Sequence, residues 1–369
     1  MMKLSFLKSN LIEGIGRTLK AVPSKTTMPI LECIMIDAST GVITLMANDM
    51  ELAIRTQVEG NILEKGKMAI DAKLFSEIIR KLPDSEIFIE EEYNDMVRIS
   101  CEKANFVIAG KRGDDFVDMP TVEKNMGIFI SQFSLKETIR QTIFSIAANE
   151  NNKLMTGELF EIEGNFLKVY SLDGHRISIR RVELKESYES RKVIVPGKTL
   201  MEISRILTGE RDKDVEIYFS RNHIVFEFDN TTVASRLIEG EYFRVNQMIS
   251  GDYETKLTVN KKDFLDSIER SVLLIRDNDK KPIILNITNE EMEITMTSLI
   301  GSMKEFMPVQ KEGKDLMIGF NPKFLIDALR VIDDETIDIY MVNSKAPCSI
   351  RDEDGSYIYL ILPVNFSRA

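Results

Sequence analysis

The stretch KLFSEIIRKL, residues 73–82, has the pattern of an amphipathic helix, and the chain repeats that pattern twice more. Its charged positions recur at an offset of 125 residues, and then again at the same offset. These positions are Lys73, Glu77 and Arg80, then Lys198, Glu202 and Arg205, then Lys323, Asp327 and Arg330. One helix with charges on one side is common, but three copies in one register indicate a repeated domain.

The apolar positions of the repeated helix are predicted to form one stripe, because each residue advances a helix by about 100°. They are Leu74, Phe75, Ile78, Ile79 and Leu82 in the first copy, and Phe324, Leu325, Ala328, Leu329 and Ile332 in the third. The charged row falls opposite this stripe. The row is either a solvated face tied together by ion pairs along the helix, or a face that contacts the same ligand in every copy.

A second helix pattern recurs with nearly the same period. LIEGIGRTL (11–19), LKETIRQTI (135–143) and FLDSIERSV (264–272) each have an acid two residues after the first apolar position. Together the two patterns predict helices that start near residues 7, 72, 132, 197, 261 and 322. A unit of about 125 residues is a normal length for one domain.

Short apolar runs and alternating stretches between the helices predict strands. Examples are GVITLMAND (41–49), EIFIEEE (86–92), HIVFEF (223–228) and EMEITMT (291–297). Each unit is therefore predicted to be an α+β domain with mostly antiparallel sheet. The predicted domains span residues 1–125, 126–250 and 251–369, with short joints near MPTVEKNMG (119–127) and QMISGDYE (247–254).

The composition is that of a globular protein with an ample core, since 43% of the residues are hydrophobic and 29% are charged. The chain lacks an apolar run of about 18 residues and a continuous apolar stretch at its start, so we expect a cytoplasmic protein. Cys33, Cys101 and Cys348 are far apart and are expected to be reduced thiols. The net charge of −11 argues against general nucleic-acid binding unless the basic residues are segregated.

SLDGHRISI, residues 171–179, is the stretch that most resembles a functional site. Three interpretations are open: Asp173 and His175 as a hydrolytic pair, a hairpin turn whose Asp binds backbone amides, or a rigid turn that presents His175 and Arg176 beside a binding groove. The sequence contains two histidines, His175 and His223, and no HExxH or GxSxG motif. We therefore predict no metal ion and no cofactor.

Five stretches occur in the order and spacing of one known family. They are SKTTMPILECI (24–34), SLDGHRISI (171–179), VIVPGKTLMEISRIL (193–207), IGFNPKFLIDALRVI (318–332) and YLILPVNF (359–366). Together they closely resemble the bacterial DNA polymerase III β subunit, the sliding clamp, and the resemblance covers essentially the whole chain. It implies three tandem clamp domains and a head-to-tail ring dimer, in which the repeated helices line a central hole.

The resemblance also implies where duplex DNA is contacted. A clamp that slides needs many weak phosphate contacts and no reading of bases. The expected DNA-contact residues are Lys25, Lys73, Arg80, Asn149, Lys198, Arg205, Lys323 and Arg330. The repeated charged row would then face the hole, and the net negative charge would lie elsewhere.

In the same family a groove binds short linear peptides of the replicative polymerase, the clamp loader and repair proteins. The matching positions are Met155, Leu172, Gly174, His175, Arg176, Ile177, Met248, Asn321, Phe324, Leu360, Leu362, Pro363, Val364 and Phe366. Apolar side chains suit such pockets, and methionine adapts to varied ligands. The chain departs from the family at Asn152, Phe243, Gln247 and Asn365, which makes the groove less basic and leaves its peptide preference open.

The dimer seam is implied to join the first domain of one chain to the third domain of the other. Its apolar candidates are Phe106, Ile108, Val272 and Leu273, whereas the acidic stretch expected opposite them is reduced to Glu305. The expected function is a non-enzymatic DNA clamp that confers processivity on the replicative polymerase. The alternatives are a hydrolase that uses Asp173 and His175, and a tandem-domain scaffold that never meets DNA.

Overall fold

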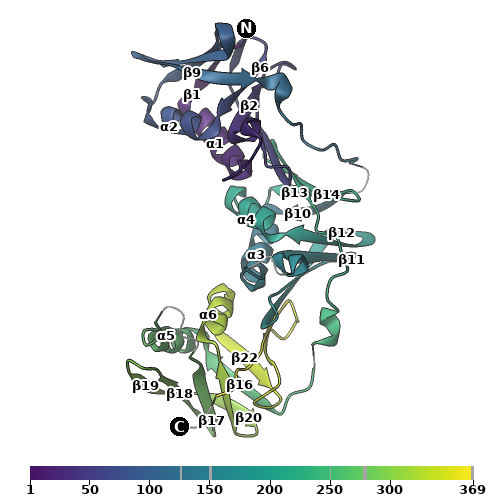
Figure 1. The fold of residues 1–369 in the computed structure, drawn as a ribbon. Helices are drawn as coiled ribbons and strands as arrows, with labels where there is room; N and C mark the ends of the chain where they lie inside the picture. The colour runs from purple at the N-terminus through teal and green to yellow at the C-terminus, as the bar shows by residue number, and fades with distance from the viewer. Residues whose placement is uncertain (125–126, 149–151, 250, 277–280, 367–369) are drawn as a thin grey trace. The chain divides into compact units, whose positions relative to one another are not determined.

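The computed structural model describes residues 1–124, 127–148, 152–249, 251–276 and 281–366. The chain divides into two compact units. Unit one comprises Met1–Phe133 and Arg205–Leu237, and unit two comprises Ser134–Ser204 and Ile238–Ala369. Each unit has its own sheets and helices (Figure 1).

The helices begin where the repeated patterns predict them. In the described residues the α-helices are α1 (Lys8–Thr18), α2 (Ala72–Lys81), α3 (Gln132–Thr142), α4 (Gly197–Ile206), α5 (Lys261–Val272) and α6 (Pro322–Val331). Polar caps explain two of these starts, because the side chains of Asp71 and Asn321 accept hydrogen bonds from Leu74 N at 2.7 Å and Lys323 N at 3.1 Å. Asp71 and Asn321 are themselves equivalent positions of the repeat.

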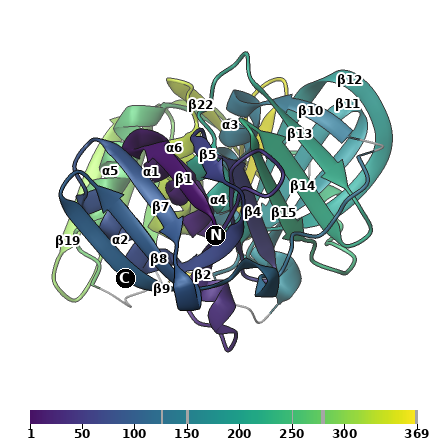
Figure 2. The ribbon, with the colours of Figure 1, turned by 90° about the horizontal axis from the view of Figure 1, so that it is seen from above.

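Unit one is built on a 13-stranded antiparallel sheet in the order β10-β13-β14-β15-β4-β3-β2-β6-β9-β8-β7-β1-β5. Its strands are β1 (Lys3–Leu7), β2 (Cys33–Asp37), β3 (Thr44–Asn48), β4 (Leu52–Gln57), β5 (Asn61–Glu64), β6 (Lys67–Asp71), β7 (Glu86–Glu91), β8 (Met96–Cys101), β9 (Ala104–Arg112), β10 (Gly127–Ser131), β13 (Asp214–Phe219), β14 (His223–Phe228) and β15 (Thr231–Arg236). Strands β4 and β15 pair with Ile54 opposite Val233, so strands far apart in the sequence form one continuous sheet. Helices α1 and α2 pack against each other (Figure 2); α1 also contacts β3 and β4, and α2 contacts β2 and β6.

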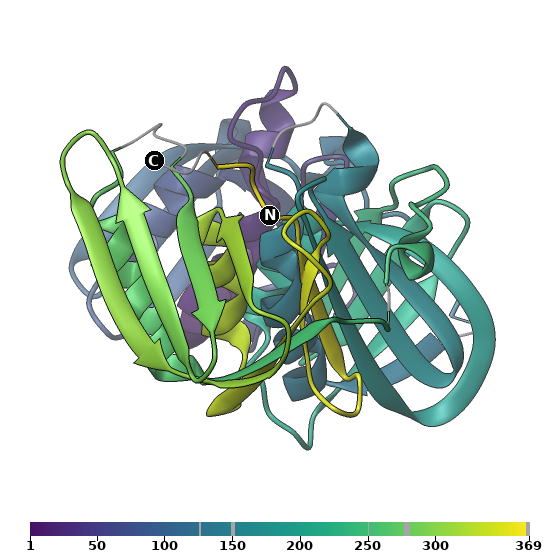
Figure 3. The same cartoon turned by 90° about the horizontal axis from the view of Figure 1, so that it is seen from below.

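Unit two contains a seven-stranded and a four-stranded sheet, with orders β11-β12-β24-β23-β22-β16-β20 and β19-β18-β17-β21. The first contains β11 (Gly157–Leu172), β12 (Arg176–Pro196), β16 (Thr255–Asn260), β20 (Gln310–Gly313), β22 (Thr336–Met341), β23 (Cys348–Arg351) and β24 (Tyr357–Ile361). The second contains β17 (Ile283–Thr288), β18 (Glu291–Thr297), β19 (Ser302–Pro308) and β21 (Leu316–Phe320), and Figure 3 shows it from below, with β19 at its edge.

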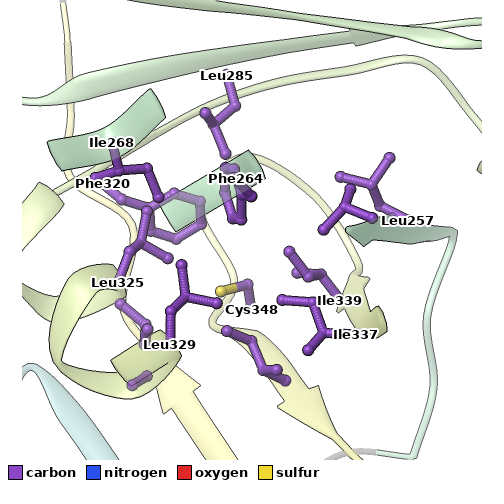
Figure 4. Packing of buried hydrophobic residues seen from close by; sticks show 14 of the residues in the cluster. Leu257, Phe264, Ile268, Leu285, Phe320, Leu325, Leu329, Ile337, Ile339 and Cys348 are labelled. Carbon is purple, nitrogen blue, oxygen red and sulfur yellow. The ribbon is translucent and has the colours of Figure 1, made fainter. Parts of the chain in front are cut away.

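The core of the third repeat shows how the two helices of a repeat pack. Figure 4 shows Phe264 and Ile268 of α5 and Leu325 and Leu329 of α6 in one cluster with strand residues of both sheets. All four are fully or almost fully buried. Burial of each such side chain contributes about 1.5–3 kcal/mol, so the apolar stripes hold both helices on the sheets.

One position of the predicted stripe was wrong. Leu74 leaves 43% of its surface exposed, whereas Phe75, Ile78 and Ile79 are buried. Leu74 lies in the first turn of α2, where its backbone N–H is held by the Asp71 cap and its side chain projects beyond the sheet. The same position in α6, Phe324, is only partly buried.

Candidate DNA-contact helices and partner surface

The basic residues of the repeated helix are exposed in all three copies. Lys73 and Arg80 of α2, Lys198 and Arg205 of α4, and Lys323 and Arg330 of α6 all lie on the surface. Lys25, in the segment between α1 and β2, is also exposed. Asn149 lies outside the described residues. Helices α2, α4 and α6 thus each present one Lys and one Arg beside a buried apolar face.

In the third copy, the acid of the charged row, Asp327, does not form its ion pair with a basic residue of its own helix. Arg330 pairs instead with Glu269 of α5, with Nη2 and Oε1 2.8 Å apart, on an exposed part of the surface. Asp327 turns to the side of α6 and pairs with Arg176, with 2.6 Å between Oδ2 and Nη1. The row of α6 is therefore a Lys and an Arg without the acid between them.

The DGHR turn joins β11 to β12. Asp173 Oδ1 accepts hydrogen bonds from His175 N at 2.9 Å and from Arg176 N at 3.1 Å. Gly174 has φ of +88°, which glycine adopts without the steric cost of a side chain. The Asp173 carboxylate also accepts from Arg176 Nε at 3.0 Å, so its oxygens serve the turn and the guanidinium.

Arg176 is the centre of this site. Only 8% of its side chain is exposed, and it bridges Asp173 and Asp327 while donating to Phe144 O. Its guanidinium also lies over the rings of Phe144 and Phe324, 5.3 and 4.6 Å from their centroids. A buried cation of this kind is stable because it has two carboxylates and two aromatic faces around it.

The His175 ring lies on the surface beside this centre. It stacks on Phe324 of α6, with ring centroids 5.9 Å apart and an angle of 21° between the planes. The site continues toward the end of the chain through β24, which pairs with β12 with Leu360 opposite Ile177. Beyond this pairing, Leu362 N donates to His175 O at 2.9 Å. Val364 N donates to Gly319 O at 2.8 Å.

We define the partner surface as the groove residues expected from the sequence, which unit two brings together. Met248 and Leu362 are exposed, whereas Met155, Ile177, Asn321, Phe324, Pro363, Val364 and Phe366 are partly buried. Leu172 and Leu360 are buried, and Leu172 packs in one apolar cluster with Tyr170, Tyr242 and Val245. The partner surface is thus an apolar strip with His175 at its rim.

Two of the four residues that depart from the family pattern, Asn152 and Phe243, make local contacts. Asn152 caps a short helical turn, since its Oδ1 accepts from Leu154 N at 3.1 Å. Phe243 packs edge-on against Tyr242, with ring centroids 5.6 Å apart. Gln247 and Asn365 are exposed and uncharged.

The seam candidates lie on one strand and at one helix end. Phe106 and Ile108 are on β9, the first exposed and the second partly buried. Leu273 follows α5 directly and leaves 79% of its surface exposed, and Val272 is partly buried.

The His, Cys, Asp and Glu side chains elsewhere in the described residues were expected to hold no metal ion. No group of three or more His, Cys, Asp or Glu side chains among them could hold a metal ion. The three cysteines are buried and free, and burial raises the pKa of the Cys348 thiol to about 12. His223, in unit one, lines a cavity of about 200 Å³ with Asn48, Glu51 and Asp118. No helix in the described ranges is long and apolar enough to cross a membrane.

Three tandem α+β domains with exposed basic residues on the repeated helices define a DNA sliding clamp. Models of the DNA polymerase III beta subunit match residues 2–120 (N-terminal domain), 129–243 (central domain) and 246–365 (C-terminal domain). The chain belongs to the DNA polymerase III β subunit family.

Individual relatives agree with this assignment over their full length. The beta sliding clamp of Staphylococcus epidermidis is 32% identical over 375 residues, which is 99% of each chain. A solved putative DNA polymerase III beta subunit from Eubacterium rectale is 62% identical, with a TM-score of 0.97 over 99% of this chain and 100% of that one. The DNA polymerase sliding clamp of Bacillus subtilis is 32% identical, with a TM-score of 0.96 and the same coverage.

These comparisons support a DNA sliding clamp for a DNA polymerase and lend no support to a hydrolase. Neither Asp173 nor His175 was brought into a catalytic pair, because the Asp173 carboxylate binds backbone amides and Arg176. Sequence reasoning missed the partnership of Asp327 with Arg176. The shared position of Asp327 in the repeated row pointed to DNA, and the sequence contains no signal that separates it from Glu77.

Proposed function

We propose that two chains close head to tail around duplex DNA and hold the replicative polymerase on its template. Each chain contributes three domains, with joints near residues 125 and 250. The protein acts in the cytoplasm, has no catalytic activity of its own and needs no cofactor. Its other partners are the clamp loader and repair proteins that carry clamp-binding peptides.

The DNA-contact residues proposed for the hole are Lys25, Lys73, Arg80, Asn149, Lys198, Arg205, Lys323 and Arg330. What supports this assignment is the exposure of the basic pair on each of α2, α4 and α6. Long flexible Lys and Arg side chains at regular spacing can exchange phosphate partners as the duplex moves. Because they read no base, the binding is independent of sequence.

The partner surface is proposed to bind short peptides of the polymerase, the clamp loader and repair proteins. The observation that carries this proposal is the stack of His175 on Phe324, which is held beneath by the buried Arg176. That arrangement fixes the imidazole next to exposed Leu362, whose N–H donates to His175 O, so a peptide meets both hydrogen-bonding groups and apolar surface. Such a rigid rim lowers the entropy cost of peptide binding.

The proposal is tested by titrating a labelled peptide from the C-terminal end of the host's replicative polymerase into the full-length protein. We expect His175→Ala to weaken binding by about tenfold, or about 1.4 kcal/mol. The matched control is His223→Ala, which removes the other histidine of the sequence from unit one and should leave the Kd unchanged. Equal affinities for both variants and the parent would contradict the assignment, as would a hydrolytic turnover that is lost with His175.

A further inference from the structure

A cavity of about 200 Å³ in unit one lies at the pairing of β4 with β15, where the N-terminal and central domains share one sheet. Ala53 of β4 and Ala234 of β15 line it from below, and both are buried. They are directly opposite each other in the pairing, so their methyl groups lie on the same face of the sheet. Larger side chains at these two positions would fill the space.

The walls of the cavity are joined to one another by hydrogen bonds. They come from the turn between β3 and β4, from the segment that follows β9 and from the start of β14. Asn48 connects the first two, because its Nδ2 donates to Val117 O at 3.3 Å and to Asp118 O at 3.5 Å. Its Oδ1 accepts from Met50 N at 2.7 Å. The cavity is therefore formed without a ligand, and the Asn48 amide is already in use.

The polar groups that the cavity leaves for a ligand include two carboxylates. Asp118 is exposed, and its carboxylate forms no hydrogen bond or ion pair with the residues that the structure describes. The His223 imidazole also has no hydrogen-bond partner among them, and only its backbone is bonded, to Ser220. Glu51 Oε1 lies 3.9 Å from Arg236 Nη1 on an exposed part of the surface, which is a weak contact.

The basic residues of this region do not pair with Asp118. Arg236, which is opposite His223 in the β14–β15 pairing, has its contact with Glu51. Lys67 interacts electrostatically with Asp118, but its Nζ lies 2.7 Å from Asp114 Oδ1. The cavity thus keeps a negative charge on its Asp118 side, which favours a cationic ligand.

The size and lining of the cavity select the kind of cation. A metal ion does not fit, because no three His, Cys, Asp or Glu side chains in the described part of the chain come close enough to hold one. The volume equals that of about seven molecules of liquid water, which is room for a small organic group. Met50, Val117 and Pro120 add apolar surface to that of the two alanines. An ammonium group on a short hydrocarbon stem matches both parts, since it has three N–H donors and an apolar stem.

We propose that this cavity binds an alkylammonium group, with its N–H donors on the carboxylates of Asp118 and Glu51 and its stem over Ala53 and Ala234. The proposal goes beyond the proposed function, because the cavity shares no residue with the DNA-contact set or the partner surface. Both the lysine side chain of a protein and a free polyamine carry this group. A bound alkylammonium group contacts β4, β15 and the segment after β9 together, and so stabilises the join between the two domains.

The two histidines of the sequence provide the test. The full-length protein is labelled with ¹³C in its histidine rings, and the two NMR signals are assigned with His175→Ala and His223→Ala. We expect n-butylammonium, added at constant ionic strength and pH 8, to shift the His223 signal to saturation with a Kd of about 1–10 mM. The His175 signal should not move. Butyrate and 1-butanol, which have the same stem with the opposite charge or no charge, should bind at least about tenfold more weakly.

Asp118→Asn tests the carboxylate without changing its size. Because Asp118 is exposed, folding should be unaffected, and we expect the Kd of n-butylammonium to rise at least about fivefold. The matched control is Asp84→Asn, an exposed carboxylate of unit one that does not line the cavity, and it should leave the Kd unchanged. Ala234→Leu fills the cavity from below and should abolish binding, and if that variant does not fold, Asp118→Asn still decides.

The source of the alkylammonium group is distinguished with two further probes, Nα-acetyl-lysine N-methylamide and 1,4-diaminobutane. Tighter binding of the first supports a lysine side chain of a protein, and tighter binding of the second supports a free polyamine. Three results would overturn the proposal: a His223 signal that does not move with n-butylammonium, equal shifts with butyrate, or the same Kd for Asp118→Asn and the parent.

Discussion

The Arg176 guanidinium joins the turn between β11 and β12 to helix α6. Its contacts with Asp173 and Asp327 are at 3.0 and 2.6 Å, and it supports Phe324 beneath the His175 ring. In the proposed function, Arg176 therefore acts on a bound peptide through the position of its neighbours. Removing either carboxylate would leave part of a buried charge uncompensated.

Asp327→Asn tests this role. We expect the free energy of unfolding to fall by about 1–3 kcal/mol, because a buried charged hydrogen bond is lost, and the peptide Kd to rise. Urea unfolding and peptide titration measure the two effects. Asp333→Asn is the control, since Asp333 pairs with Arg140 but is 75% exposed, and its loss should cost less than about 1 kcal/mol. Equal small effects of both changes would mean that Arg176 is held without Asp327.

Glu158 is a second residue whose environment has a measurable consequence. It is fully buried in β11, and its carboxyl oxygens have no hydrogen-bond partner among the described residues. The nearby Thr142 hydroxyl, which favours the ionised form, donates to Thr138 O at 2.8 Å. Burial dominates and raises the pKa of Glu158 to about 8.

The raised pKa makes stability depend on pH. Between the ordinary carboxyl pKa of 4.5 and about 8, the folded state holds a proton that the unfolded state has lost. The free energy of unfolding therefore falls as pH rises through this window, by about 1.4 kcal/mol per pH unit from this group, and levels off above it. Glu158→Gln should remove this slope. The free energy of unfolding of the variant, relative to that of the parent, should therefore increase from pH 5 to pH 8.

Urea unfolding at pH 5, 6.5 and 8 measures this effect. Glu186→Gln, on an exposed part of β12, serves as the control and should leave the pH dependence unchanged. Parallel curves for the parent and Glu158→Gln would show that Glu158 ionises normally in the folded protein.

Helix α6 shows how one element serves two surfaces. Lys323 and Arg330 are exposed on one side, whereas Phe324 and Asp327 turn toward the DGHR turn. The equivalent helices α2 and α4 keep the exposed basic pair. The basic pair is thus common to the three copies, and the contact with the partner surface is specific to the third.

Changing Arg80, Arg205 and Arg330 together to Ala tests the common function. Folding should barely change, because the residues are exposed and Ala is a good helix former. The ring loses six charges, and since a duplex touches only part of the hole at once, the salt slope of DNA retention should flatten by about one to three units.

The control for that variant replaces three exposed basic residues that lie in turns between strands, Lys65, Arg221 and Lys345. Peptide affinity should be unchanged in both variants. If the two variants retain DNA equally at each salt concentration, the repeated row is only a solvated face.

The sequence predicted the elements that depend on local pattern. The six helix starts were predicted from apolar spacing and are confirmed to within one residue, and the DGHR turn was predicted from Asp173–Gly174. The long strands β11 and β12 were not predicted along their full length. Residues 183–191 of β12 are rich in charge and exposed, so they lack the alternation that marks a half-buried strand.

Contacts between elements were less predictable than the elements. Leu74 fits the apolar stripe by spacing, but its exposure depends on where the sheet ends, which spacing does not reveal. Asp327 fits the charged row in the same way, but its partner comes from a strand 151 residues earlier in the chain. In both cases the surroundings of the residue come from other elements, which the local pattern does not contain.

At the scale of the whole molecule, the net negative charge opposes binding to the phosphates of DNA. The chain contains 59 acidic and 48 basic Lys and Arg residues, for a net charge of −11, and a ring of two chains doubles this excess. A protein with this charge gains little from long-range attraction to phosphate. We therefore propose that retention on DNA comes from closure around the duplex and that the basic pairs provide only local contacts.

The most direct test of this account compares retention on circular and linear DNA. The protein is loaded by its clamp loader onto a nicked circular plasmid, the loader is removed at high salt, and half of the sample is cut once with a restriction enzyme. We predict that the protein stays on the uncut circle and is lost from the cut DNA by sliding off its ends. Equal retention on both forms would show that it binds the DNA surface without encircling it, and would contradict the clamp.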